Sequence, residues 1–221
     1  MFYYVLRIIV IFLSKLAIRR RVVGLNNVPR QKACIVVANH VNLLDSPLLG
    51  ISLGRKVYFM AKEELFESDL VAWAANNFGA FPVAKGKLDR RAGRKALELL
   101  SQNQALVILP EGKRSENGKL GQAYPGAALL AFRSNVPIVP VGIMGTKNLS
   151  GKLWFLKRPI IEINIGMPFR LSYNKDKLSK EDISCFTNEI MTHIAELLPP
   201  ELRGQYEKKV ANFPQNHNSI S

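Results

Sequence analysis

The sequence contains few cysteines and no acidic residue near its beginning. Cys34 and Cys185 are the only two cysteines in 221 residues, which is too few for a disulfide framework. Their separation also lacks the spacing of a zinc site, so a reducing compartment is favoured. The first acidic residue is Asp45, and seven basic residues precede it: Arg7, Lys15, Arg19, Arg20, Arg21, Arg30 and Lys32.

Long hydrophobic runs are also missing. Residues 2–13 are apolar except for Arg7, whereas a membrane-spanning helix needs about 18 or more such residues. The run has aromatic residues and is followed by basic ones, which predicts a helix lying in the cytoplasmic membrane interface. We therefore assign residues 1–24 to an amphipathic, basic anchoring helix. The alternative is a helix packed on the core of its own domain. A secretory signal fits poorly, because no small-residue cleavage site follows the run.

No internal repeat and no linker divides the chain, so we expect a single domain at residues 25–198. From Pro199 onward the sequence becomes polar, which predicts a loosely held C-terminal tail over residues 199–221. Aromatic stacking platforms and recognisable nucleic-acid reader modules are not found either, so no nucleic-acid partner is expected.

Basic residues are what the chain has in excess. Lys and Arg number 31 against 17 Asp and Glu, which gives a formal net charge of +14 and an isoelectric point near 10.0. Such an excess predicts an anionic partner, such as a membrane surface or a phosphorylated substrate.

Apolar, β-branched runs alternate with amphipathic stretches along the chain. We expect strands near residues 33–38, 56–61, 80–83, 105–109, 137–141 and 160–165. Helices are expected near residues 46–54, 63–77, 88–102, 126–133 and 179–198. This alternation predicts an α/β fold in which helices flank a mostly parallel central sheet.

Polar clusters follow several of these strands, at the end of a parallel sheet where ligands usually bind. His40 and Asp45 follow the first strand. A carboxylate that accepts a hydrogen bond from one ring nitrogen leaves the other nitrogen free to take a proton. No Ser or Cys nucleophile accompanies them, so the hydroxyl group is expected to come from the substrate. The alternative is an ordinary loop histidine beside a helix-capping aspartate.

A second cluster, Pro110-Glu111-Gly112-Lys113-Arg114-Ser115, follows the strand near residues 105–109. The guanidinium of Arg114 and the ammonium of Lys113 suit a phosphate group. Glu111 could accept a hydrogen bond from a polyol hydroxyl or hold the arginine. Taken alone, this segment could also be an ordinary turn.

Together these residues resemble the glycerolipid acyltransferase family, in particular its 1-acylglycerol-3-phosphate (lysophosphatidate) acyltransferases. Four blocks match in order: Asn39-His40-x4-Asp45, Gly79–Val83 leading to Lys85, Pro110–Ser115 and Val136–Val141. The resemblance implies acyl transfer to the sn-2 hydroxyl of lysophosphatidate, giving phosphatidate. It implies acyl-CoA or acyl-carrier-protein as the donor, with no metal and no bound cofactor. The expected location is the cytoplasmic face of the cell membrane, with peripheral attachment.

The resemblance also implies roles for individual residues. His40 would be the general base and Asp45 its orienting group. Its substrate-binding residues would be Lys85, Glu111, Gly112, Lys113, Arg114 and Pro140. Glu111 and Arg114 would contact the glycerol phosphate, and Pro140 would shape the acyl site. Two departures concern head-group choice: the family usually has Arg near Lys85, and a small residue where Lys113 stands.

Three other interpretations remain open from the sequence. The acceptor could be another lysolipid. Gly50-Ile51-Ser52-Leu53-Gly54 matches the nucleophile elbow of serine lipases and esterases, although that motif needs a strand before the serine and a helix after it. The chain could also be a non-catalytic, basic peripheral membrane-binding protein, which would leave His40, Asp45 and Glu111 without a role.

Overall fold

The computed structural model describes residues 2–83, 90–151, 153–174 and 177–211. In this part of the chain, seven strands form one sheet: β1 (Arg19–Val23), β2 (Cys34–Ala38), β3 (Val57–Lys62), β4 (Ala80–Val83), β5 (Ala105–Ile108), β6 (Ile138–Met144) and β7 (Ile160–Ile165). The longer helices are α1 (Phe2–Ala17), α2 (Asp45–Ser52), α3 (Asp69–Asn77), α4 (Arg90–Ser101), α5 (Gly126–Ser134) and α6 (Lys180–Glu196). Shorter helical segments are η1 (Leu25–Asn27), η2 (Glu63–Phe66), η3 (Thr146–Asn148), η4 (Trp154–Lys157), η5 (Pro200–Leu202), η6 (Gly204–Tyr206) and α7 (Glu207–Ala211).

The sheet has the strand order β1-β7-β6-β2-β5-β3-β4. Neighbouring strands run parallel except for the antiparallel pair β6 and β7. The predicted α/β fold with a mostly parallel sheet and flanking helices is therefore confirmed. The antiparallel pair at one side was not predicted, because an apolar strand carries no sign of its direction.

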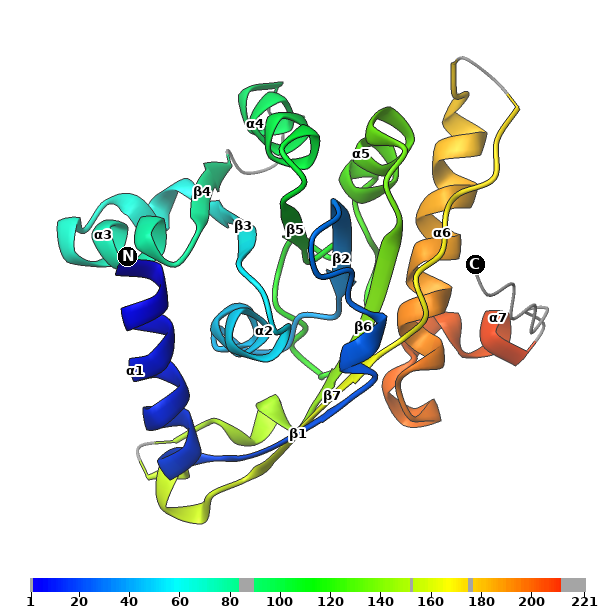
Figure 1. The fold of residues 1–221 in the computed structure, drawn as a ribbon. Coiled ribbons are helices and arrows are strands. Elements are labelled where there is room, and N and C mark those ends of the chain that lie inside the picture. The colour runs from blue at the N-terminus through cyan, green and yellow to red at the C-terminus, as the bar shows by residue number, and fades with distance from the viewer. Residues whose placement is uncertain (1, 84–89, 152, 175–176, 212–221) are drawn as a thin grey trace.

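Two hydrophobic layers cover the sheet (Figure 1). Helices α1 and α2 pack over one face, where buried side chains such as Leu49 and Val36 meet. Helices α4, α5 and α6 cover the other face, where Ile190 and Ile194 of α6 meet Ile35 of β2. Strand β2 lies at the centre and is fully buried on both faces, as its continuous apolar sequence requires. Cys34 belongs to this strand, and burial raises the pKa of its thiol to about 11.

The N-terminal helix is shorter than the predicted segment 1–24. It ends at Ala17, and Arg19–Val23 form strand β1, which pairs with β7 along its whole length. Alternate side chains of β1, Arg20 and Val22, are partly buried, whereas their neighbours are exposed. The backbone partners for this short basic strand come from a segment about 140 residues away. Arg19, Arg20 and Arg21 therefore belong to the sheet, whereas Lys15 lies in the last turn of the helix.

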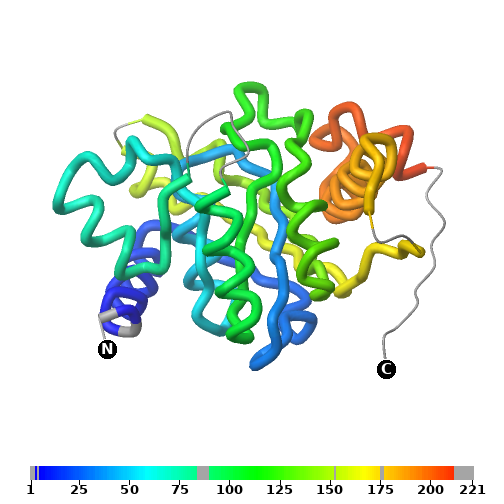
Figure 2. Tube along the Cα trace, turned by 90° about the horizontal axis from the view of Figure 1, so that it is seen from above, coloured from blue at the N-terminus to red at the C-terminus, as the bar shows by residue number. Residues whose placement is uncertain are grey.

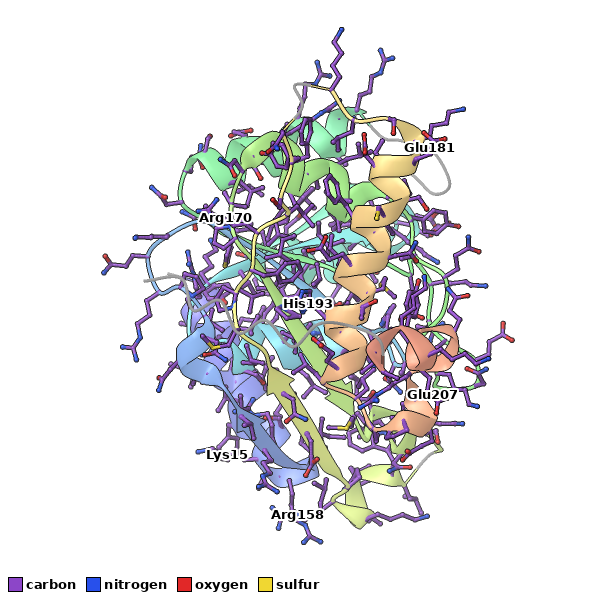
Figure 3. The ribbon with its side chains drawn as sticks, turned by 90° about the vertical axis from the view of Figure 1, so that its right-hand side faces the viewer. Lys15, Arg158, Arg170, Glu181, His193 and Glu207 are labelled. Carbon is purple, nitrogen blue, oxygen red and sulfur yellow. The ribbon has the colours of Figure 1, made fainter. Side chains whose placement is uncertain are left out.

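The C-terminal segment also differs from the predicted loose tail. Figure 3 shows α6 with α7 beside it, and in sequence η5 and η6 connect the two helices. Tyr206 is only 2% exposed and joins the hydrophobic layer under α6. The carbonyl of Leu202 accepts a hydrogen bond from the Leu120 amide at 2.8 Å. Residues 200–211 are thus part of the domain, and 212–221 lie outside the described residues.

Candidate active site

The predicted site residues gather where two adjacent parallel strands end. Strands β2 and β5 pair in register, and the loops that follow them leave the same edge of the sheet. In Figure 2 the segment after β5, drawn in green, lies at the upper end of the molecule, opposite the end that carries the N-terminus. His40 comes two residues after β2, and Glu111 comes three residues after β5. This is the sheet edge at which ligands of open α/β folds bind.

The imidazole of His40 faces the carboxylate of Asp45. The distance between His40 Nδ1 and Asp45 Oδ2 is 2.9 Å. Asp45 is fully buried, and its Oδ2 also accepts from the backbone amides of Val41 and Asn42 at 2.7 Å each. These donors fix the carboxylate at the first turn of α2, so Nδ1 carries the proton toward Asp45 and Nε2 remains the basic nitrogen. The His40 side chain is 16% exposed, which leaves it accessible to a substrate.

Glu111 holds the backbone of the loop that carries His40. Its Oε1 accepts from the amide of His40 at 2.9 Å, and its Oε2 accepts from the amide of Gly121 at 2.8 Å. The residue is only 3% exposed. Burial raises the pKa of Glu111, while the two amide hydrogen bonds oppose this shift. The geometry therefore gives Glu111 a positioning role, and its predicted contact with glycerol phosphate stays a prediction.

Lys113 and Arg114 extend from the same loop into solvent. The amide of Ser115 donates to the backbone carbonyl of His40 at 2.7 Å. Lys113 and Arg114 directly precede Ser115 in the chain, so this hydrogen bond ties their loop to the His40 backbone. Both side chains are exposed and are accessible to an anionic group. Gly112 precedes them with φ of 62°, and a Cβ there would lie 2.9 Å from the ring of Tyr124. A side chain at this turn would be strained and would also displace Tyr124.

One predicted residue that the structure describes does not join this cluster. Pro140 is buried within β6, where it pairs with Val37 and its carbonyl accepts from the Gly166 amide at 2.9 Å. It is part of the sheet interior, so its predicted role in shaping an acyl site stays a prediction. Lys85 lies outside the described residues.

Asn39 is a structural residue of the site that the sequence analysis did not single out. Its side chain is 3% exposed and bridges from β2 to β6. Nδ2 donates to the Ile143 carbonyl at 2.9 Å, and the Ile143 amide donates to Oδ1 at 2.7 Å. The available signal was a polar amide directly after an apolar strand and directly before His40.

Ser52 does not form a nucleophile elbow. It is the last residue of α2, is 5% exposed, and donates through Oγ to the carbonyl of Leu48 at 2.5 Å. A helix leads into it and strand β3 follows, which reverses the strand-then-helix order of an elbow. As for metals, no three His, Cys, Asp or Glu side chains within the described ranges gather closely enough to hold an ion together.

Comparison with models of protein families assigns the chain to one of them. The family model described as Acyltransferase matches residues 19–144, which is more than half of the chain. The chain belongs to the acyltransferase family. The matched region of this acyltransferase contains His40, Asp45, Glu111, Arg114 and Pro140.

Individual relatives share this assignment. A chloroplastic 1-acyl-sn-glycerol-3-phosphate acyltransferase of Brassica napus is 31% identical over 180 residues, 78% of this chain and 49% of its own length. The 1-acyl-sn-glycerol-3-phosphate acyltransferase of Streptococcus pneumoniae is 30% identical, over 89% of this chain and 73% of its own length. This acyltransferase chain spans about half the length of the plant relatives that it matches.

A solved structure also resembles this acyltransferase. The crystal structure of the 1-acyl-sn-glycerophosphate acyltransferase PlsC from Thermotoga maritima superposes with a TM-score of 0.65 and 30% sequence identity. The match covers 85% of this chain and 76% of the other. The likeness therefore extends over most of the described domain.

Proposed function

We propose that the chain transfers a fatty acyl group to the sn-2 hydroxyl of lysophosphatidate and so forms phosphatidate. The observation that carries the proposal is the 2.9 Å contact between His40 Nδ1 and Asp45 Oδ2, next to a loop with two exposed cations. The names of the Streptococcus pneumoniae and Thermotoga maritima proteins support the same acceptor. The product would enter phospholipid biosynthesis.

The reaction needs one proton transfer and one exchange of bonds at the acyl carbon. His40 Nε2 takes the proton from the sn-2 hydroxyl as its oxygen attacks the carbonyl carbon of the acyl thioester. Asp45 stabilises the imidazolium that results. The tetrahedral intermediate then expels the thiolate of the donor, with cleavage of the carbon–sulfur bond, and the imidazolium can return the proton to sulfur. The donor is acyl-CoA or acyl-carrier-protein.

Arg114, with Lys113, would hold the phosphate so that the hydroxyl meets His40. General-base assistance contributes about 10² to 10⁴ in rate, and fixing the acceptor contributes through the entropy that no longer has to be lost in the transition state. Glu111 acts through His40, because both of its carboxylate oxygens bind backbone amides around the site.

Membrane association belongs to the same proposal. The outward side chains of α1 include Ile8, Phe12 and Leu16, which are 65%, 62% and 60% exposed. Apolar side chains of α3 and of the segment around η4 continue this surface, namely Leu70, Trp73, Leu153 and Leu156. Both elements contact α1, and Figure 1 shows them at the same side of the molecule. Figure 3 labels Lys15 and Arg158, where the guanidinium of Arg158 donates to the Lys15 carbonyl at 2.9 Å.

We propose that this surface lies in the cytoplasmic leaflet of the cell membrane. We call it the apolar face, and it consists of Ile8, Phe12, Leu16, Leu70, Trp73, Leu153 and Leu156. Several large apolar side chains exposed on neighbouring elements are typical of a surface that contacts a membrane or a partner. Basic residues at the end of α1 and in β1 would then meet anionic head groups. In the described residues, no helix has the length and apolar character that crossing a membrane requires.

The test is an acyl-transfer assay with purified protein, liposomes and both classes of donor. We expect His40→Ala to reduce kcat by about 10² to 10⁴. Arg114→Ala should mainly raise KM for lysophosphatidate and affect a zwitterionic lysolipid much less. Lys119→Ala is the matched control, because it removes one exposed charge from the same loop.

Two results would contradict the proposal. If Arg114→Ala and Lys119→Ala lost equal acyl-transfer activity, Arg114 would not bind the phosphate. The same holds if Arg114→Ala lost equal activity with phosphate-bearing and zwitterionic acceptors. Vesicle binding without turnover from any donor, unchanged in His40→Ala, would instead identify a non-catalytic membrane-binding protein.

A further inference from the structure

A cationic cavity lies at the edge of the sheet opposite the candidate active site. It has a volume of about 340 Å³ and is lined by Tyr3, Arg7, Arg30, Arg55, Lys56 and Gln104, among others. Arg30, Lys56 and Gln104 come shortly before β2, β3 and β5. Because these three strands are parallel, their amino ends meet at one edge, whereas His40 and Arg114 follow their carboxyl ends. The cavity is therefore separate from the acceptor site.

Positive charge in this cavity is held in place but is not neutralised. Arg7 donates to the carbonyls of Gly50 and Ile51 at 3.4 and 3.3 Å. Arg55 donates to the carbonyls of Pro29, Lys32 and Asn103. Carbonyl oxygens satisfy the N–H groups of a guanidinium but carry no full negative charge. The lining contains no acidic residue, and the ion pairs found among the described residues involve other side chains.

A further arginine adds to the same positive field. Burial lowers the pKa of Arg20, and the positive charge of Arg7 lowers it further. The Nη1 atom of Arg20 is buried without a hydrogen-bond partner in the described part of the protein. Cations that lack a paired carboxylate are the arrangement that an anion would stabilise.

Two cations of the cavity remain accessible to a ligand. Arg30 is exposed at the rim. The ammonium of Lys56 lies 5.3 Å from the centre of the Tyr3 ring and 4.8 Å from that of Tyr58, so aromatic faces hold it in position. Guanidinium and ammonium groups together are the usual partners of phosphate oxygens.

The position of α1 indicates where such a phosphate would come from. Tyr3 and Arg7 of α1 line the cavity, while Val5, Ile8 and Ile9 of the same turns are exposed to solvent. The cavity therefore lies beside the apolar face, at the level where head groups would meet a helix that is embedded by its apolar side. A lipid phosphate would reach it while its acyl chains stayed in the membrane.

We propose that this cavity binds the phosphate of an anionic phospholipid, as a second lipid site distinct from that of the acyl acceptor. The proposal rests on the membrane-binding part of the proposed function. It does not depend on the reaction at His40. Occupation of the site would fix the N-terminal half of α1 and the amino edge of the sheet against the membrane surface.

Binding of a water-soluble, short-chain phosphatidylglycerol, measured by calorimetry on the full chain below its micellar concentration, tests this site. Monomeric lipid creates no membrane surface potential, so the measurement separates a built site from general attraction. We expect the double variant Arg30→Gln/Lys56→Gln to weaken binding about tenfold or more. The matched control Lys15→Gln/Arg19→Gln removes two exposed charges from the end of α1 and from β1, and should change binding less than twofold.

Three further arms make the result decisive. Arg114→Ala should retain this binding, since retention places the lipid outside the acceptor site, and loss would overturn the proposal. Equal effects of the two double variants would also overturn it. Inorganic phosphate is the third probe. Two results together would show that the ligand is free phosphate and not a lipid. The first is that inorganic phosphate binds the cavity as tightly as the short-chain lipid, and the second is that vesicles of phosphatidylcholine with phosphatidylglycerol bind both double variants equally.

Discussion

At the scale of single residues, the carboxylate of Glu111 connects local electrostatics to the position of the base. Burial raises the pKa of this group above its ordinary value of 4.5. The folded protein therefore holds the Glu111 proton more tightly than the unfolded chain does. The stability from this difference is present below the unfolded pKa and is lost as the pH rises through the raised pKa.

Glu111→Gln should remove this pH dependence. We expect the free energy of unfolding of the wild type, minus that of the variant, to fall as the pH rises from 4 toward neutrality. Urea unfolding at several pH values measures the difference. A Gln side chain can accept a hydrogen bond from only one of the two amides, so either the His40 amide or the Gly121 amide loses its partner. The backbone around His40 is then held less firmly, and kcat should fall as well. A difference that is flat across this pH range would contradict the buried, ionisable role.

The pairing of His40 with Asp45 could be predicted from spacing, whereas the role of Glu111 could not. His40 and Asp45 are close together in one short loop, so their side chains can reach each other. Asp45 is also the first residue of α2. The partners of Glu111 are backbone amides of His40 and Gly121, which any residue type supplies. A sequence pattern therefore gives no sign of them. The sequence alone therefore predicts a substrate contact for this carboxylate and not its bonds to the backbone.

At the scale of secondary-structure elements, the end of β2 is attached to β6 by a side chain. Asn39 uses its amide to continue the hydrogen-bond pattern where the strand itself stops. Removal of this amide leaves the amide and the carbonyl of Ile143 buried without these partners, and each such group costs about 1 to 3 kcal/mol.

Asn39→Ala should therefore lower the free energy of unfolding by about 2 to 6 kcal/mol. Asn26→Ala is the matched control, since Asn26 is exposed in η1 and its loss should change stability by less than about 0.5 kcal/mol. Urea unfolding, with the slope of the transition checked for each variant, measures both. If Asn39→Ala were as stable as the control, the bridge to Ile143 would have no energetic importance.

Element boundaries were predictable where periodicity is local and not where partners are distant. The strand at residues 160–165 and the alternation of strands with helices follow from local apolar patterns. Arg19–Val23, by contrast, are basic and become a strand only because β7 supplies a pairing edge. Residues 200–206 are similar: their polar composition predicts a tail, yet Tyr206 and Leu202 pack against the core and secure the segment.

At the scale of the whole molecule, the cationic cavity and the apolar face both involve α1, whereas the candidate active site lies at the opposite edge of the sheet. Ile8 and Phe12 are exposed, so their substitution should affect membrane binding more than folding. Full burial of such a side chain contributes about 1.5 to 3 kcal/mol, which corresponds to about tenfold or more in affinity.

We expect Ile8→Ser/Phe12→Ser to weaken binding to vesicles of phosphatidylcholine alone and to vesicles with added phosphatidylglycerol by similar factors. Co-sedimentation with vesicles measures both. Met167→Ser is the control, because Met167 is 56% exposed but lies outside the apolar face. Unchanged vesicle binding by the double variant, or an equal loss in the control, would show that α1 does not enter the lipid.

The two hydrogen bonds between the loops after β2 and β5 have a consequence for how the site opens. The carboxylate of Glu111 accepts a hydrogen bond from the His40 amide, and the His40 carbonyl accepts one from the Ser115 amide. These two hydrogen bonds join the two loops just beyond the point where strands β2 and β5 stop pairing. The two loops cannot separate without breaking both of these hydrogen bonds. The amide protons of His40 and Ser115, 75 positions apart, should thus exchange with deuterium at a common rate, as reporters of one shared fluctuation.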